Sequence, residues 1–449
     1  MQPRMLGATG WSLVNMNRYR KFVLLVVFIM YTLVFGSRIS IGVTIPALVS
    51  EFGMTNTEAG ALSGFFFLGY FMTQIPAGLW IARSGCRILV GVALCLMSLF
   101  LWLFGSMTTL TWAGWYRLGL GVTQGPVSVG GNSVIGQWFP PREQSRAIAV
   151  MVASTMLAPV LFPPFCSWFI VNWGWRALFQ FFGIAGLVVA GCWTYYIRSC
   201  PEESRRCSTA ELAEIRAPGL ITNSNQPAQR SGMVAKLFST ARTVTVAQTK
   251  RELLRSRDLL LTTLAYFFFV SVFYGIITWL PSYFVNARGM DLISMGWLAA
   301  VPWVSALIGA LTGGWIVDHW LGGNPLPVMV WGSVLTSASL YLFMVAPVTV
   351  GWTVALLLLF GLFVGLTPAG YMTYPIRLAG REIYPIGMSV MNSGGNVGGF
   401  LAPFVAGVLL DRYGNYTAMF WYFILCGLLS AVFGLFIRRP VAEKSSGTL

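Results

Sequence analysis

Two arginines, Arg38 and Arg117, each interrupt a long apolar stretch of the sequence, and no acidic residue lies in the interior of any such stretch, away from its ends. An ionised side chain inside a membrane is costly, is usually kept off the lipid, and marks a substrate or ion pathway. A guanidinium offers a planar fork of N–H donors that fits a carboxylate or a phosphate. The sequence therefore predicts a site that lacks negative charge and binds an anion. The alternative is that either arginine packs against helix-end carbonyls or reaches the membrane surface.

The composition indicates that these arginines lie in a membrane protein. The chain has 449 residues, of which 56% are hydrophobic and only 10% are charged, and its mean hydropathy is +0.71. Hydrocarbon about 30 Å thick needs roughly 20 apolar residues for each helical crossing. The first apolar stretch has no small-residue cleavage site and is read as a retained span. Twelve spans are predicted, at residues 22–48, 57–82, 87–106, 110–138, 146–170, 176–197, 258–284, 292–317, 325–346, 351–375, 383–410 and 416–437.

The placement of the charges predicts the topology. The net charge is +15, which in a soluble protein would suggest nucleic acid as a partner. With the N-terminus inside, 24 of the 29 Lys and Arg fall in the two tails and the even-numbered loops. This positive-inside bias predicts cytoplasmic termini, with the basic excess facing anionic lipid rather than nucleic acid. The seven cysteines form no CxxC pair, so neither a disulfide nor a metal site is expected, and no cofactor.

The chain divides into two halves that repeat. GMTNTEAG from Gly53 matches GMDLISMG from Gly289 at an offset of 236, and GLWIARSG matches GWIVDHWLG at the same offset. WGWRALFQF around Gly174 matches YGNYTAMFW around Gly414 at an offset of 240. A near-constant offset indicates duplication. We predict an all-α membrane protein of twelve helices, with six-helix bundles at 1–197 and 258–449 around a central cavity.

The segment between the halves, residues 198–257, is polar and contains eleven Lys and Arg. It is predicted to be a solvated cytoplasmic linker. Part of it, from Ser208 to Arg216, has the pattern of an amphipathic helix at the membrane surface.

These motifs resemble the major facilitator superfamily over the whole chain. GLWIARSGCR, from Gly78 to Arg87, is similar to the superfamily signature between spans 2 and 3. Within the superfamily the chain looks most like the anion:cation symporter family, which includes sugar-acid transporters and vesicular glutamate transporters. The segments that carry this likeness are SRISIGVTIPALVSEFGMT, YRLGLGVTQGP with the following WFPPREQSRA, TWLPSYF and NSGGNVGG.

The chain departs from the family pattern at the positions of its carboxylates. Acidic-sugar transporters of the family carry Asp before the span 1 arginine, where this chain has Ser37. They carry Glu seven residues after the span 4 arginine, where it has Gln124, and the loop signature's Asp is Ala82. The carboxylates that the resemblance links to proton coupling are therefore missing, and span 7 lacks the arginine of the vesicular members.

Polar side chains near the arginines complete the predicted site. Gln124 lies on the same helical face as Arg117, two turns away, as the spacing of seven requires. For the other half, the resemblance implies hydroxyl contacts by Tyr274, Thr278, Asn392 and Asn396. The alternative for the asparagines is hydrogen bonding between helices. Tyr70 and Gln74 in span 2 are further candidates.

The resemblance also implies a gating loop. Its residues are Gly78, Arg83, Gly85 and Arg87, with Asp318 and His319 at the matching place in the second half. His319, the only histidine, could relay a proton, but we predict a contact that closes the inner gate. The sequence contains no Ser-His-Asp, paired-carboxylate or phosphate-loop pattern, so no enzyme is predicted.

Together these features predict a secondary transporter of a small organic anion, such as a sugar acid, in which two halves rock about the site. Arg38 would bind the acid group with support from Arg117. A proton or a counter-anion is a candidate second partner, and a monomer in a bacterial inner membrane is expected. Organophosphate–phosphate or other anion exchange, export of an anionic siderophore or drug, and a membrane sensor that does not transport remain the alternatives.

Overall fold

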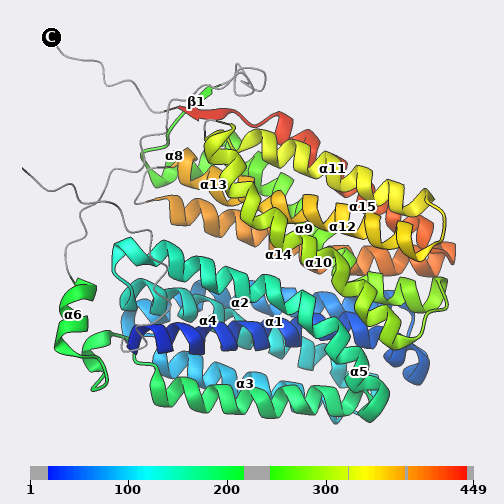
Figure 1. Cartoon of the computed structure of the whole chain (residues 1–449), viewed down its shortest axis with the longest axis horizontal. Helices are drawn as coiled ribbons and strands as arrows, with labels where there is room; N and C mark the ends of the chain where they lie inside the picture. The colour runs from blue at the N-terminus through cyan, green and yellow to red at the C-terminus, as the bar shows by residue number, and fades with distance from the viewer. Residues whose placement is uncertain (1–18, 217–242, 322, 380–382, 442–449) are drawn as a thin grey trace, which may run out of the picture.

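The computed structural model describes residues 19–216, 243–321, 323–379 and 383–441. These residues form long helices that run side by side in two stacked bundles (Figure 1). The helices of the first half are α1 (Tyr19–Phe52), α2 (Asn56–Ser84), α3 (Arg87–Gly105), α4 (Ala113–Trp138) and α5 (Pro141–Tyr196). Those of the second are α9 (Arg257–Ser282), α10 (Leu292–His319), α11 (Leu326–Val345), α12 (Val350–Leu366), α13 (Pro368–Leu378), α14 (Tyr384–Tyr413) and α15 (Tyr416–Leu435).

Within the described residues, these helices give the twelve membrane crossings that the sequence predicts. Ten segments are long and apolar enough to span a membrane. One of them contains two crossings, because α5 is broken at Gly174, whose backbone (φ 82°, ψ 163°) is not helical. The twelfth is α4, which has 26 residues but is less apolar, since it contains the glycine-rich polar stripe. The predicted all-α membrane fold is confirmed.

Two turns depart from regular α-helix. The α9 helix continues into a π-helical turn, η3 (Tyr283–Ala287), beyond the predicted end of that span at residue 284. The crossing predicted at 351–375 is made by α12 and α13 together, joined at Thr367, where Pro368 begins the second helix. Proline is favoured at a helix start, where its missing N–H would have no intrahelical partner.

The two halves meet through matching helix pairs. A Cβ on Gly60 of α2 would lie 2.2 Å from the Pro403 carbonyl oxygen of α14. The same approach recurs between α10 and α5, where a Cβ on Gly296 would lie 2.9 Å from the Pro163 carbonyl oxygen. Gly60 and Gly296 stand 236 positions apart and Pro163 and Pro403 stand 240 apart, which are the offsets of the sequence repeat. The interface therefore has approximate two-fold symmetry, and glycine permits the close helix packing.

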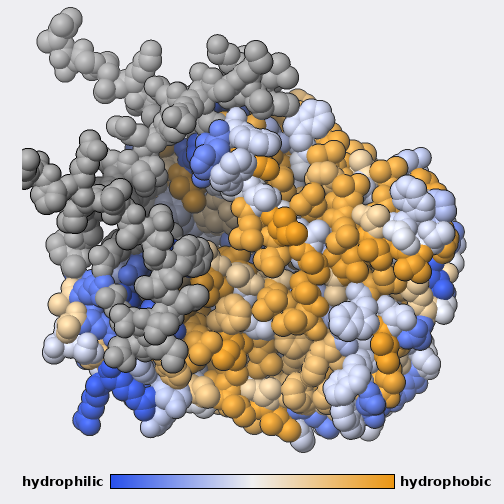
Figure 2. Space-filling model, in the orientation of Figure 1, coloured by the Kyte–Doolittle hydropathy of each residue, from blue (hydrophilic) through white to orange (hydrophobic). Residues whose placement is uncertain are grey.

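These contacts lie at one end of the molecule, where α1 ends and α2 begins, which we call the closed end (right in Figure 1). At the opposite end, where α1 and α9 begin, the bundles diverge in Figure 1. The surface between them is hollowed there, beside the grey atoms, in Figure 2. We call this the open end. An apolar band covers most of the visible face of both halves (Figure 2), as expected for a surface in contact with lipid.

Part of the linker packs against the open end of the first half. The helix α6 (Thr209–Arg216) lies within the segment predicted to be amphipathic. Its Glu211, only 5% exposed, accepts hydrogen bonds from the backbone N–H groups of Tyr19 and Arg20 at 3.1 and 3.0 Å. A carboxylate at a helix N-terminus accepts hydrogen bonds from the N–H groups that lack a partner in the helix. Its negative charge also interacts favourably with the positive end of the helix dipole. This part of the linker is thus docked on α1 rather than fully solvated; residues 217–242 lie outside the described residues.

The rest of the described linker approaches the second half. A short strand, β1 (Thr243–Thr245), pairs in parallel with β2 (Arg439–Val441) near the C-terminus. The helix α8 (Lys250–Arg255) follows and leads into α9. Asp258, at the start of α9 and fully buried, pairs with Arg438 at 2.7 Å. The linker is therefore attached at the open end of both halves.

Enlarging Gly60 should loosen the closed end. In Gly60→Ala the added Cβ meets a backbone carbonyl, which cannot rotate away, so the halves must separate there. We expect faster modification by a water-soluble thiol reagent of Ser167→Cys, a reporter site buried at the α5–α10 contact. The control is Gly314→Ala in α10, where the added Cβ meets nothing within 4 Å. Equal labelling rates in the two variants would contradict this account of the interface.

Candidate functional site

Arg38 lies in the middle of α1 and faces the other half of the protein. It is 5% exposed. Its Nη1 donates to the Tyr274 hydroxyl of α9 at 3.4 Å, and its Nη2 donates to Gln124 Oε1 of α4 at 3.3 Å. Its buried Nε has no hydrogen-bond partner among the described residues. Both of these bonds are long for a charged donor, and the Nε–H group is unused. The guanidinium can therefore still donate hydrogen bonds to an anion.

Three aromatic rings surround the Arg38 guanidinium. Its central carbon lies 4.4 Å from the ring centroid of Phe35, 4.7 Å from that of Phe66 and 4.8 Å from that of Tyr70. Ring faces attract a cation, most strongly when it is desolvated. Sequence reasoning missed Phe35 and Phe66, because Phe is frequent in these spans, with 32 in the chain. They partly replace the stabilisation that a neighbouring carboxylate would give.

Arg117 lies in α4, against α2, and is 2% exposed. Its Nε donates to the Leu62 carbonyl at 3.4 Å, and its buried Nη1 finds no partner in the described parts of the chain. Its guanidinium carbon is 5.5 Å from the centroid of the same Phe66 ring that Arg38 contacts. The two cations thus share one aromatic neighbour. Arg117 has a helix-packing contact as well as an unused donor, so both sequence-based interpretations remain compatible with its position.

Neither arginine pairs with a carboxylate among the described residues. The acidic side chains that form ion pairs lie near helix ends or in the linker: Glu51, Glu143, Glu202, Glu214, Asp258 and Asp318. A buried charge without a partner is strongly destabilising. Within the described part of the chain, no acidic side chain therefore neutralises these two cations.

Gln124 lies at the centre of the polar cluster and is completely buried. Its Oε1 accepts from Arg38, while its Nε2 donates to Ser37 Oγ at 3.2 Å. The two positions where the family pattern has carboxylates, 37 and 124, are therefore in contact with each other and next to Arg38. Both of them hold neutral residues in this chain.

The residues predicted in the second half are placed at different distances from Arg38. Tyr274 contacts Arg38 directly. The Thr278 backbone lies against α1, where a Cβ on Gly42 would be 3.2 Å from its carbonyl oxygen. The Nδ2 of Asn396 donates to Gln74 Oε1 of α2 at 3.4 Å, which links the halves. Asn392 is half-buried one turn away. Tyr70, from α2, donates its hydroxyl to Ser128 at 2.8 Å.

The predicted gating residues lie at the open end, apart from this cluster. Gly85 ends α2 with φ +76°, and a Cβ there would lie 2.4 Å from Ser199 Oγ, so the position requires glycine. Arg87 donates to the Thr194 carbonyl at 3.0 and 2.9 Å and so joins α3 to α5 within the first half. Arg83 is exposed and Gly78 is loosely packed.

In the second half, Asp318 lies 3.9 Å from Arg377. The His319 ring stacks on Trp315 at 5.1 Å, and its Nδ1 lies 3.1 Å from the Trp315 carbonyl oxygen. Neither residue contacts the first half through these interactions. Their gating role stays a prediction.

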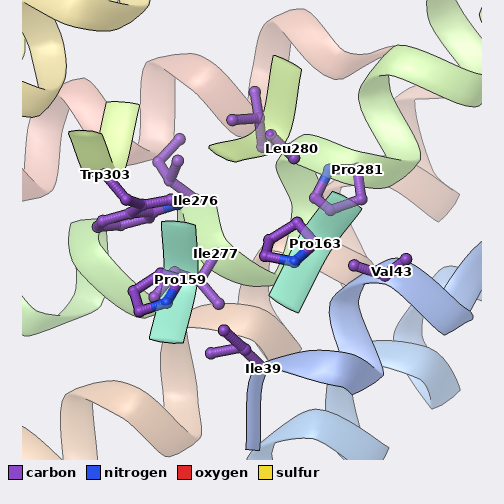
Figure 3. Close-up of a pocket in the computed structure, with 10 residues that line it drawn as sticks. Ile39, Val43, Pro159, Pro163, Ile276, Ile277, Leu280, Pro281 and Trp303 are labelled. Carbon is purple, nitrogen blue, oxygen red and sulfur yellow. The ribbon is translucent and has the colours of Figure 1, made fainter. Parts of the chain in front are cut away.

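A small cavity lies between α1, α5, α9 and α10 at the interface of the halves (Figure 3). Its volume is about 10 Å³, enough for roughly one water molecule. Its lining is apolar and comprises Ile39, Val43, Pro159, Pro163, Ile276, Ile277, Leu280, Pro281, Ala299 and Trp303. Such a lining cannot bind an acid group, so this cavity is a packing gap rather than the anion site.

Known proteins resemble this chain over almost all of its length. The probable galactarate/D-glucarate transporter GarP of Escherichia coli (strain K12) is 25% identical over 435 residues, covering 93% of this chain and 94% of the relative. The hexuronate transporter of Bacillus subtilis (strain 168) is 24% identical, covering 95% and 96%. The D-galactonate transporter of Escherichia coli O6:H1 is 24% identical, covering 90% and 92%.

A solved structure shares the fold. It is a bacterial homologue of the human lysosomal transporter Spinster in an inward-facing and occupied conformation, with a TM-score of 0.72 and 16% identity, covering 93% of this chain and 95% of that one. The profile of the Major Facilitator Superfamily matches residues 27–403 and 327–448. The chain therefore belongs to the Major Facilitator Superfamily, whose members are multi-pass membrane transporters and not enzymes.

Proposed function

We propose that this protein moves a small organic anion across a bacterial inner membrane, with the acid group bound by Arg38. The observation that carries the proposal is the buried Arg38 guanidinium, which has no carboxylate partner and an unused N–H donor among the residues that the structure describes. The relatives named above support a sugar acid as the substrate class. Tyr274 and Asn396, from the second half, would contact the substrate hydroxyls.

The same geometry supports alternating access. The site lies where α1 and α9 meet, the matching contacts close one end, and the other end is hollowed. Rocking of the two halves about their approximate symmetry axis would exchange the closed and open ends. If both termini are cytoplasmic, as the positive-inside bias predicts, the described state opens to the cytoplasm. The bound anion would reduce the cost of burying two cations during the switch.

A second candidate function is exchange of one anion for another. The observation that favours it is the neutral pair Ser37 and Gln124 beside Arg38, because the described residues around Arg38 then include no carboxylate to carry a proton. An empty site would have to close around two unpaired cations, which is unfavourable. Exchange keeps an anion bound during each switch. Proton movement on the substrate itself is the competing account.

Uptake into proteoliposomes tests the proposed function. We expect labelled galactarate, glucarate, hexuronates or galactonate to enter vesicles that contain the protein, and unlabelled acid inside to accelerate entry if exchange operates. The matched neutral sugars, which lack the acid group, should neither enter nor compete. Binding of an acid, measured as a rise in melting temperature, without any entry would instead identify a sensor. Entry of organophosphates alone would favour the phosphate-exchange alternative.

A further inference from the structure

A single carboxylate joins the two halves at the closed end. Asp411, near the end of α14 in the second half, receives four hydrogen bonds from the first turn of α2 in the first half. Its Oδ1 accepts from the backbone N–H of Asn56 at 2.9 Å and from the Asn56 side chain at 2.8 Å. Its Oδ2 accepts from the backbone N–H of Thr57 at 2.7 Å and from the Thr57 hydroxyl at 2.6 Å.

These bonds complete the N-terminus of α2. The first N–H groups of a helix have no partner within it and carry partial positive charge. The α2 helix has its own capping box, in which Thr55 accepts from the Glu58 N–H and Glu58 accepts from the Thr55 N–H. The N–H groups of Asn56 and Thr57 are left for Asp411. The second half thus supplies the remaining cap of a helix in the first half.

In the described structure, no carboxylate bonds across the matching interface between α5 and α10. Gly296 and Pro163 repeat the contact of Gly60 and Pro403, but the start of α10 is capped from its own half. There, Asp291 Oδ1 accepts from the N–H groups of Ile293 and Ser294, both at 3.0 Å. The approximate symmetry therefore holds for the helix packing and fails for the charged contact. The four bonds of Asp411 therefore form only while the closed end is shut.

At the open end, the loop signature lacks the carboxylate of the superfamily pattern. The position that holds Asp in the superfamily pattern is Ala82, which is exposed. Asp318, at the matching place in the second half, lies near Arg377 of the same half. Charged contacts therefore favour closure at one end of the molecule over closure at the other.

We propose that Asp411 is a latch that holds the closed end shut, so that the empty protein rests with its site accessible from the open end. The inference rests on the proposed alternating access. Opening the closed end would break all four bonds and leave two helix N–H groups and a carboxylate to water. A substrate arriving from the closed end must then bind a minor state, which weakens its apparent affinity by the fraction of that state.

Thiol labelling of the empty protein tests the latch without any substrate. In the Ser167→Cys background, Asp411→Asn should increase the labelling rate on the order of tenfold, because a charged acceptor is replaced by a neutral amide with one oxygen. The matched control is Asp291→Asn, which changes the same residue type at a helix start at the same end but crosses no interface. It should leave the rate unchanged. The protein without Ser167→Cys gives the background from its seven native cysteines.

A charge swap provides an independent test. Asn56→Asp places a second carboxylate against Asp411 and should increase labelling as Asp411→Asn does. The double variant Asn56→Asp with Asp411→Asn restores a carboxylate–amide pair and should return the rate toward that of the parent. Equal rates in Asp411→Asn and Asp291→Asn, or no restoration in the double variant, would overturn the latch. If the labelling rates change as expected but the parent protein moves no acid into vesicles, the latch stands and the proposed function fails.

Discussion

Arg38→Ala is expected to abolish substrate binding and transport while the protein still inserts into the membrane and purifies. The reason is that Arg38 has the only guanidinium that contacts both halves in the described structure, through Gln124 and Tyr274. A hydrogen bond to a charged group is worth about 1.5–3 kcal/mol. Since 1.4 kcal/mol is a factor of ten, losing two such bonds to an acid should weaken binding by roughly a hundredfold or more. Isothermal titration and vesicle uptake would measure the loss.

Arg38→Lys separates charge from geometry. An ammonium keeps the positive charge but cannot place two parallel N–H groups against one carboxylate. It also loses the flat face that packs against Phe35 and Phe66. We expect a defect nearly as large as that of the alanine variant. The matched control is Arg288→Lys, at an arginine that also donates to a tyrosine hydroxyl, Tyr283, but lies near the closed end. Near-normal transport by Arg38→Lys would mean that only charge or packing matters.

The unmodified protein is expected to transport with little dependence on an imposed pH gradient, whereas Gln124→Glu should create such a dependence. Gln124 lies 3.3 Å from the Arg38 guanidinium and 3.2 Å from Ser37. A glutamate there would pair with Arg38 in the empty site. An arriving acid would compete for the same guanidinium, and the displaced carboxylate would take up a proton. Substrate and proton would then move together.

The measurement is accumulation in vesicles at a fixed membrane potential, with and without a pH gradient. Adding Ser37→Asp should strengthen the effect, because it restores the second carboxylate of the family pattern. Gln180→Glu, which changes the same residue type at a half-buried position where the side chain bonds to Ser106, is the matched control. Strong gradient-driven accumulation by the unmodified protein would contradict the hypothesis and assign the proton to the substrate or to another group.

Local sequence was sufficient for the fold and for the charged residues of the site. Span lengths, the 236-residue repeat and the absence of acidic residues from the interior of the spans depend only on residue type and spacing. They predicted the twelve helices and the unpaired arginines. Helical spacing to Arg117 had pointed to Gln124 and the family resemblance to Tyr274, and in the structure both side chains contact Arg38.

Long-range partners could not be predicted in the same way. Nothing near Asp411 in the sequence points to Asn56, which is 355 positions away. The docking of Glu211 on the start of α1 depends on how the linker folds back across 191 residues. The three aromatic rings around Arg38 could not be predicted either, because aromatic residues occur in every span and nothing in the sequence distinguishes these three. Such contacts follow from the packing of whole helices.

The pairing of Arg38 with Tyr274 has a consequence for the different roles of the two halves. These residues are 236 positions apart, so they occupy equivalent places in the duplicated sequence and face each other across the symmetry axis. An ancestor built from two identical halves would have set like against like there, and two arginines would repel. Divergence to arginine on one side and a neutral phenol on the other removes that conflict. It also makes the partners unequal: in the proposed transport cycle, the half that carries Arg38 would retain the anion, and the half that carries Tyr274 would close over it and withdraw.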